Sequence, residues 1–204
     1  MPCVPRQRRL SLLLLLACLA IAPARATVLQ ELGFEALVQQ SQLIFLGTVL
    51  RSATESDDGL VHTRLWFSVE ALISGDAPQP DFSLRFVGGD DGTHYVDVAG
   101  QYIPAVGQRG VWFVRDVLDH QVNPLTGWQQ GAFPVEVLPD GTQVLDLSDH
   151  PDLILRNLRA DPVGSKMLDA GYGEDRIAAQ VPDYARFPLQ DFVDAISAIA
   201  EAGP

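Results

Sequence analysis

The stretch from Val61 to Ile73 alternates between two kinds of side chain along its length. Successive side chains of a β-strand point to opposite sides of the sheet, whereas an α-helix repeats every 3.6 residues. One side carries Val61, Thr63, Leu65, Phe67, Val69 and Ala71, and the other carries His62, Arg64, Trp66, Ser68 and Glu70. The period of two therefore predicts a long strand that buries one face in a core.

Further strands are expected before and after it, which predicts a mainly β domain. Their ranges are 43–50, 82–86, 95–98, 111–115, 133–138 and 143–147. Turn residues separate them at Asp58-Gly59, Asp91-Gly92 and Pro139-Asp140-Gly141. No helical pattern intervenes between 43 and 147, which favours a barrel or a sandwich.

Helices are expected only near the two ends of the folded part. A short helix is predicted over 29–41, and a second over 189–200. The second has an apolar stripe through Leu189, Phe192, Val193, Ile196 and Ile199, which should pack on the sheet. Between 155 and 187 glycine and proline interrupt any pattern, so we expect coil there, with a short helix near 175–180 and the highest sensitivity to protease.

The amino terminus has the three parts of a secretory signal. Three arginines precede an apolar run over 10–22, and Ala24-Arg25-Ala26 supplies small residues for cleavage between Ala26 and Thr27. The run is shorter than the ~20 residues that span a bilayer. We therefore expect a periplasmic or secreted protein with no membrane span after cleavage. Two alternatives are a lipoprotein anchored through Cys18 and twin-arginine export through Arg8-Arg9.

Removal of residues 1–26 makes an acidic chain more acidic. The 204 residues contain 14 basic and 26 acidic residues, and four of the arginines lie in the signal. The mature chain then has 10 bases against 26 acids, a net charge of −16. Such a charge excludes nucleic acid as the expected partner, because phosphates would be repelled. Both cysteines also leave with the signal, which excludes a cysteine nucleophile or a cysteine-bound zinc.

An ordered set of segments resembles a group of secreted bacterial proteins over residues 28–138. The set comprises Glu35–Val38, Ser41–Val49, the strand from Thr63 to Ile73 followed by Gly75, Gly88-Gly89, Val106-Gly107, Val111–Val114 and Gly127–Phe133. More remotely, these proteins resemble the netrin-like domain of the tissue inhibitors of metalloproteinases. The resemblance implies an OB-type closed barrel over 27–150, with 151–204 forming coil and a packed carboxy-terminal helix.

The inhibitory mechanism does not carry over with the fold. The inhibitors chelate the protease zinc through an amino-terminal cysteine, whereas the expected mature chain begins at Thr27 and contains no cysteine. Fold alone does not establish activity.

No pattern in the chain predicts a catalytic centre, a bound metal or a cofactor. His94, His120 and His150 lie near aspartates, but none shows the spacing that places two ligands on one element. Asp90, Asp91 and Asp97 favour a hairpin turn over a calcium site. A metal-dependent hydrolase assembled from scattered histidines and aspartates stays open as the alternative function.

The polar side of the long strand is the candidate binding surface. His62, Arg64 and Trp66 project together there, and Arg85 joins them if the next strand pairs antiparallel. The competing interpretation, and the favoured one for Trp66, is that the indole packs under the carboxy-terminal helix. The sequence thus predicts an exported, non-catalytic binding module, inhibitor-like toward an envelope or extracellular protein. Its partner and oligomeric state are left open.

Overall fold

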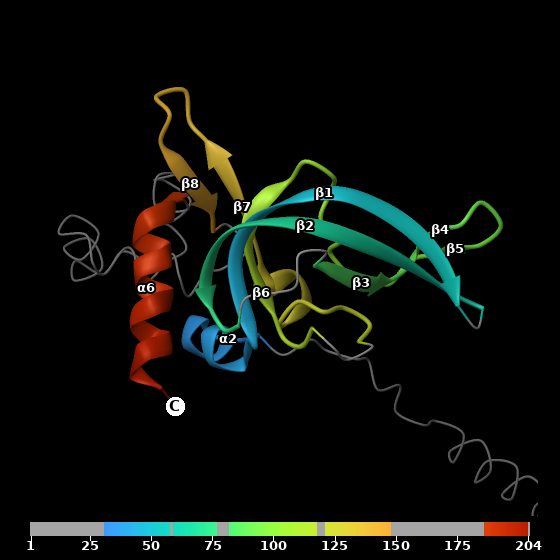
Figure 1. Ribbon diagram of the computed structural model, residues 1–204, viewed down its shortest axis with the longest axis horizontal. Coiled ribbons are helices and arrows are strands. Elements are labelled where there is room, and N and C mark those ends of the chain that lie inside the picture. Colours follow the sequence, from blue (N-terminus) through green and yellow to red (C-terminus); the bar gives the residue numbers. More distant parts are fainter. Residues whose placement is uncertain (1–30, 58, 77–81, 118–120, 148–185, 204) are drawn as a thin grey trace, which may run out of the picture. The chain divides into compact units, whose positions relative to one another are not determined.

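The structure is a computed structural model that describes residues 31–57, 59–76, 82–117, 121–147 and 186–203. The chain divides into Met1–Gln30 and Glu31–Pro204, and all described residues belong to the second unit. Its elements, shown in Figure 1, are α2 (Phe34–Gln40), β1 (Leu43–Asp57), β2 (Leu60–Ser74), β3 (Ser83–Val87), β4 (Gly89–Asp90), β5 (Tyr95–Val96), β6 (Arg109–Val114), the 3-10 helix η1 (Trp128–Gly131), β7 (Ala132–Val137), β8 (Gln143–Asp146), β9 (Arg186–Pro188) and α6 (Leu189–Ala202). The mainly β prediction is confirmed.

Seven strands form one antiparallel sheet in the order β3-β2-β1-β6-β7-β8-β9, and β4 pairs with β5 in a separate hairpin. The sheet is open, with β3 and β9 at its edges, so the described residues do not form the closed barrel expected from the sequence. Within the described strands, β1 pairs with β6 only over Leu43–Thr48 and then continues with β2 alone. Among the described strands, β3 pairs only with β2.

The first half of β1 is buried on both faces, as its continuous apolar run predicts. Ile44 and Leu46 belong to one hydrophobic cluster, whereas Leu43 and Phe45 belong to the other. The neighbouring strand β6 repeats this division, with Phe113 on the first side and Trp112 on the second. A sheet with a core on each face at this point explains why the alternation of polar and apolar residues is lost here.

The helices cover the first cluster. The α6 stripe places Leu189, Phe192 and Ile196 in that cluster, together with Phe34 and Leu37 of α2. The ring of Phe192 lies 4.8 Å from that of Phe133 and 5.2 Å from that of Phe34, measured between centroids. The predicted packing of the carboxy-terminal helix on the sheet is thus confirmed, and Figure 1 shows α6 beside α2.

The second cluster packs on one face of strands β1, β2 and β3. Its members from these strands include Val49, Leu65, Phe67, Leu84 and Phe86. The predicted alternation of β2 is confirmed through Phe67. Ala71 was expected on the apolar face but is exposed. Irregularities in the β1–β2 pairing change the face of the sheet to which side chains near the end of β2 point.

Strand β1 continues to Asp57, well beyond the predicted end at Leu50. Its second half, Arg51–Asp57, is polar and mostly exposed, so hydrophobicity gives no sign of it. Pairing with β2 holds it in place through the register Arg51↔Trp66 to Asp57↔Leu60. The extension places Arg51, Glu55 and Asp57 beside β2.

A small hairpin, β4–β5, lies outside the main sheet. The turn at Asp91-Gly92 is confirmed, but Tyr95–Val96 pairs with Gly89–Asp90, which was not predicted as a strand, and not with the predicted strand 82–86. The elements η1 and β9 were not predicted either. The expected coil over 155–187 lies outside the described residues, apart from Arg186 and Phe187 in β9. In the described part of the chain, no helix has the length and hydrophobicity needed to cross a membrane.

Candidate binding face of the sheet

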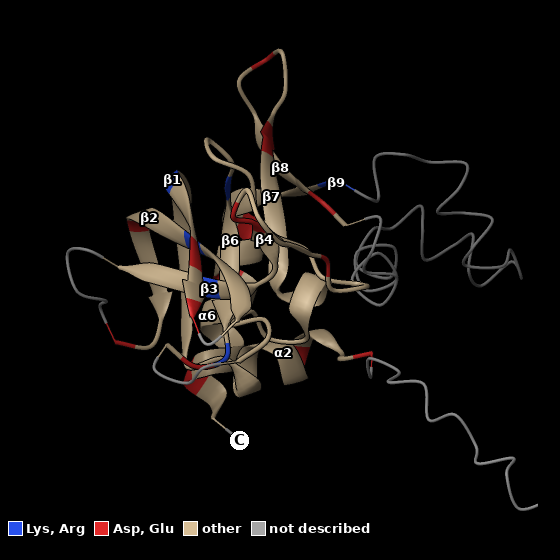
Figure 2. Cartoon of the chain, turned by 90° about the vertical axis from the view of Figure 1, so that its right-hand side faces the viewer, with Lys and Arg blue, Asp and Glu red and all other residues tan. Residues whose placement is uncertain are grey.

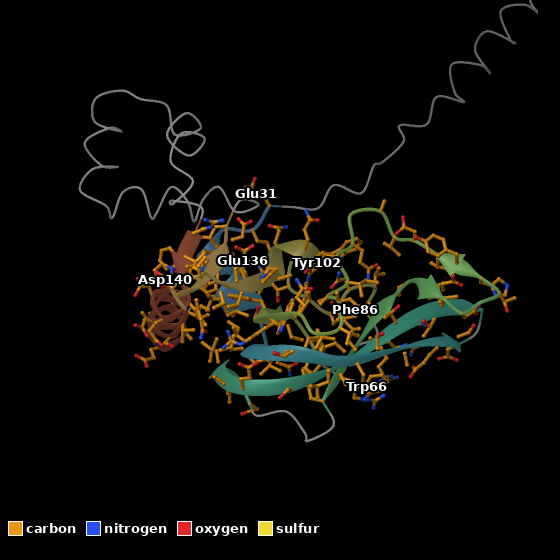
Figure 3. The ribbon with its side chains drawn as sticks, turned by 90° about the horizontal axis from the view of Figure 1, so that it is seen from above. Glu31, Trp66, Phe86, Tyr102, Glu136 and Asp140 are labelled. Carbon is orange, nitrogen blue, oxygen red and sulfur yellow. The ribbon has the colours of Figure 1, made fainter. Side chains whose placement is uncertain are left out.

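One face of β1, β2 and β3 carries a compact set of charged and aromatic side chains. We call it the arginine–tryptophan face, and its members are Arg51, Glu55, Asp57, His62, Arg64, Trp66, Ser83 and Arg85. Register brings them together, since Arg64 faces Arg85 across β2–β3 and Trp66 faces Ser83. Figure 3 shows Trp66 and the core residue Phe86 on opposite sides of the sheet. Acidic and basic segments are interspersed on these strands in Figure 2.

Arg64 is held by a carboxylate in the two-pronged geometry that a guanidinium favours. Its Nε and Nη2 donate to the two oxygens of Glu55 at 2.7 and 2.9 Å, and its Nη1 donates to Ser83 Oγ at 3.3 Å. These hydrogen bonds are the main reason that the pKa of Glu55 lies below its usual value and that of Arg64 above it. The ion pair fixes the guanidinium beside the indole.

Trp66 lies between two guanidinium groups. The Arg51 Cζ atom is 3.3 Å from the centre of the ring system, and the Arg64 Cζ atom is 5.9 Å from it. This is cation–π geometry, to which Trp contributes more than other aromatic residues. The indole is half-buried. It is absent from the cluster that receives the α6 stripe, so the interpretation that Trp66 packs under the carboxy-terminal helix is wrong.

His62 and Arg85 form the other end of the face. The Arg85 Nη2 atom lies 2.9 Å from His62 Nδ1 and 3.3 Å from Asp57 Oδ2. A guanidinium has only donors, so His62 Nδ1 accepts this bond in the tautomer whose proton is on Nε2. The same Nδ1 lies 3.1 Å from the Leu60 carbonyl oxygen, to which it donates in the other tautomer. Burial, followed by the positive charge of Arg85, lowers the pKa of His62.

Arg51 differs from the other two arginines of the face. It is exposed, and among the described residues its only charged or aromatic contact is the indole of Trp66. The guanidinium can therefore stack on the ring while offering its N–H groups to a carboxylate or carbonyl of a ligand. The face combines an ordered aromatic surface with one cation available for binding.

The four residues proposed from the sequence are thus brought together, and four more are added to them. Arg51, Glu55 and Asp57 were not predicted to join the face, because the apolar run that predicts the first strand ends at Leu50. The signal that could have found them is the turn at Asp58-Gly59, since folding 51–57 back on the long strand places alternate residues beside Trp66, Arg64 and His62. Ser83 joins the face because it pairs with Trp66 across β2–β3.

His94 does not join this face. His94 is exposed and its Nδ1 lies 3.6 Å from Asp91 Oδ2 in the β4–β5 turn. The Asp91 carboxylate accepts hydrogen bonds from the backbone N–H groups of Thr93 and His94, which is the behaviour of a turn residue. His120 and His150 lie outside the described residues. Within the described ranges, no three histidine, cysteine, aspartate or glutamate side chains gather in a way that could hold a metal ion.

Comparison of the chain with protein-family models, with curated proteins and with solved structures finds no match.

Proposed function

We propose that this chain is an exported, non-catalytic binding module that recognises an envelope or extracellular protein through the arginine–tryptophan face. The observation that carries the proposal is the half-buried Trp66 stacked against Arg51 at 3.3 Å on an outward face of the sheet. Tryptophan and arginine are the residues most often responsible for binding energy at protein interfaces. The netrin-like resemblance and an inhibitor-like role belong to the same proposal.

The way in which the face is held supports a binding role. Arg64 and Arg85 are fixed by Glu55 and Asp57, so a partner would meet groups that are already ordered. Preorganisation reduces the entropy lost on association. Arg51 supplies hydrogen-bond donors for a carboxylate, and the indole supplies apolar area.

The test is capture of a partner by the purified protein from secreted and periplasmic fractions of the producing organism. We expect the double variant Arg64→Ala, Trp66→Ala to lose capture at least tenfold, which corresponds to about 1.4 kcal/mol. The matched control is Arg115→Ala, Tyr95→Ala, which removes an exposed arginine and an exposed tyrosine away from the face. Equal capture by both variants contradicts the proposal.

Stability must be measured beside capture. Trp66 is half-buried rather than fully exposed, so we expect Trp66→Ala to cost about 1 kcal/mol, more than the ~0.5 kcal/mol of an exposed substitution. A loss of about 3–5 kcal/mol is typical of a core aromatic residue and would contradict the assignment of Trp66 to a binding surface. Stoichiometric metal in the purified protein would favour the hydrolase alternative.

A further inference from the structure

The second half of β1 has an open edge. Strand β6 pairs with β1 only as far as Thr48, and the turn Ala105–Gln108 covers the next residue through Val49 N–H to Gln108 O (2.9 Å) and Gly107 N–H to Val49 O (2.8 Å). From Arg51 to Asp57, the only described strand beside β1 is β2. Figure 1 shows β1 and β2 running on together beyond β6.

The backbone groups that point out of this edge can be identified. Val61 accepts from Gly88 N–H and Phe67 donates to Phe82 O, so the odd-numbered residues of β2 between them direct their backbone groups toward β3. The alternation of a strand then directs His62, Arg64 and Trp66 toward β1. Their partners Glu55, Ala53 and Arg51 point back toward β2. The outward residues of β1 are therefore Ser52, Thr54 and Ser56.

These three residues form a polar, uncovered edge. Their side chains are exposed, and among the described residues no backbone hydrogen bond is seen at their N–H and C=O groups beyond the β1–β2 ladder. Such an edge is a template for another strand unless proline, charged side chains, a bulge or a covering segment blunts it. The three outward residues carry no charge, and the bulge between Val49 and Arg51 lies before them. Residues 51–57 contain no proline.

We propose that this edge pairs with the same edge of a second copy, antiparallel, with the two-fold axis at Thr54. In that register Thr54 faces Thr54 of the second copy, and Ser52 faces Ser56. All outward backbone groups then oppose one another, and each opposed pair exchanges its N–H···O bonds. Thr–Thr and Ser–Ser neighbours across strands add side-chain contacts.

Charge selects this register over its neighbours. With the axis at Thr54, the available Arg51 lies opposite Asp57 of the second copy, and Glu55 lies opposite Ala53. Moving the axis toward Asp57 places Glu55 opposite Glu55, which is destabilising. Moving it toward Arg51 brings Asp57 opposite Val49, whose edge the 105–108 turn already occupies. The contact is small, so we expect a dissociation constant of roughly 10–100 µM, typical of weak association through a small interface.

The first experiment is sedimentation equilibrium of the purified protein from about 1 to 500 µM, a range that brackets the expected dissociation constant. We expect a monomer–dimer equilibrium that Thr54→Pro abolishes, because proline removes the outward N–H without removing a bond to β2. The matched control is Thr54→Val, which keeps the N–H and should stay dimeric. A monomer throughout the range, or a dimer unaffected by Thr54→Pro, overturns the proposal.

The second experiment keeps the proposal testable if Thr54→Pro fails to fold. Arg51→Glu and Asp57→Arg each place like charges opposite one another at both ends of the contact, so each should weaken the dimer about tenfold. The double variant restores opposite charges and should recover the dimer to within about threefold. Arg115→Glu, with the same change in net charge as Arg51→Glu, should have no such effect. Failure of the double variant to recover overturns the register.

Discussion

At the scale of single residues, Gly47 has the most demanding position in the sheet. It lies in β1 where β2 and β6 approach on either side, and an added Cβ would lie 2.4 Å from the Ser68 carbonyl oxygen and 3.0 Å from the Phe45 ring. The Gly47 carbonyl also accepts the indole N–H of Trp112 at 2.9 Å, inside the core.

We predict that Gly47→Ala destabilises the protein by about 3 kcal/mol, because the clash is with backbone that cannot rotate away. Gly33→Ala is the control, since a Cβ there meets nothing within 4 Å and the residue has an ordinary φ of −65°. It should change the free energy of unfolding by less than about 0.5 kcal/mol. Urea unfolding of both variants measures the difference, and equal losses would show that the β1–β2 spacing is wrong.

His62 should make the stability depend on pH in a defined window. Its pKa is lowered in the folded chain, so below about 6.5, the value of a free histidine, the unfolded chain binds a proton that the folded chain does not. Stability contributed by neutral His62 is present above that pH and is lost as the pH falls. The carboxylates Glu55 and Glu70, whose pKa values are also lowered, act at lower pH.

We therefore predict that the free energy of unfolding falls between pH 7 and pH 5, and that the fall is smaller in His62→Asn, because the amide oxygen can accept from Arg85 at any pH. Chemical unfolding across this range is the measurement. If His62→Asn keeps the full slope, Arg85 does not donate to a neutral imidazole.

At the scale of elements, the sequence could predict those strands and helices that bury a regular pattern of apolar residues. The strands that bury alternate or continuous apolar residues were placed within a few residues, as was α6, because burial imposes those patterns. The polar half of β1 could not be predicted, because pairing with β2 rather than a core holds residues 51–57 in place. The amino-terminal helix begins at Phe34 instead of 29, since Gly33 is extended and serves as its N-cap.

The packing of α6 gives the prediction for this scale. Phe192 is 2% exposed, and its ring contacts those of Phe34, Phe113, Phe133 and Phe187. Phe192→Ala should cost about 3–5 kcal/mol through lost burial and a cavity. Gln190→Ala, exposed on the same helix, should cost less than about 0.5 kcal/mol. Thermal unfolding that shows equal midpoints for the two variants would contradict the packing of the helix on the sheet.

At the scale of the whole molecule, pattern alone did not reveal that the sheet is open. Strand order depends on which edges meet, and the same set of amphipathic strands can close or stay open. The candidate face was likewise predicted only in part. Trp66, Arg64, His62 and Arg85 share it by strand period, whereas Arg51 joins them only because β1 continues past Leu50 and carries a bulge between Val49 and Arg51.

Export is a prediction about the whole chain. The basic start, the apolar run and Ala24-Arg25-Ala26 predict cleavage after Ala26. Every described core residue lies in the unit that begins at Glu31, so cleavage there would remove none of them. Intact mass and amino-terminal sequencing of the exported protein should give a chain that starts Thr27-Val28-Leu29. A chain that retains Met1 contradicts export with cleavage, and an acylated chain that starts at Cys18 identifies a lipoprotein instead, because the lipid signal would then have overridden the Ala24–Ala26 site.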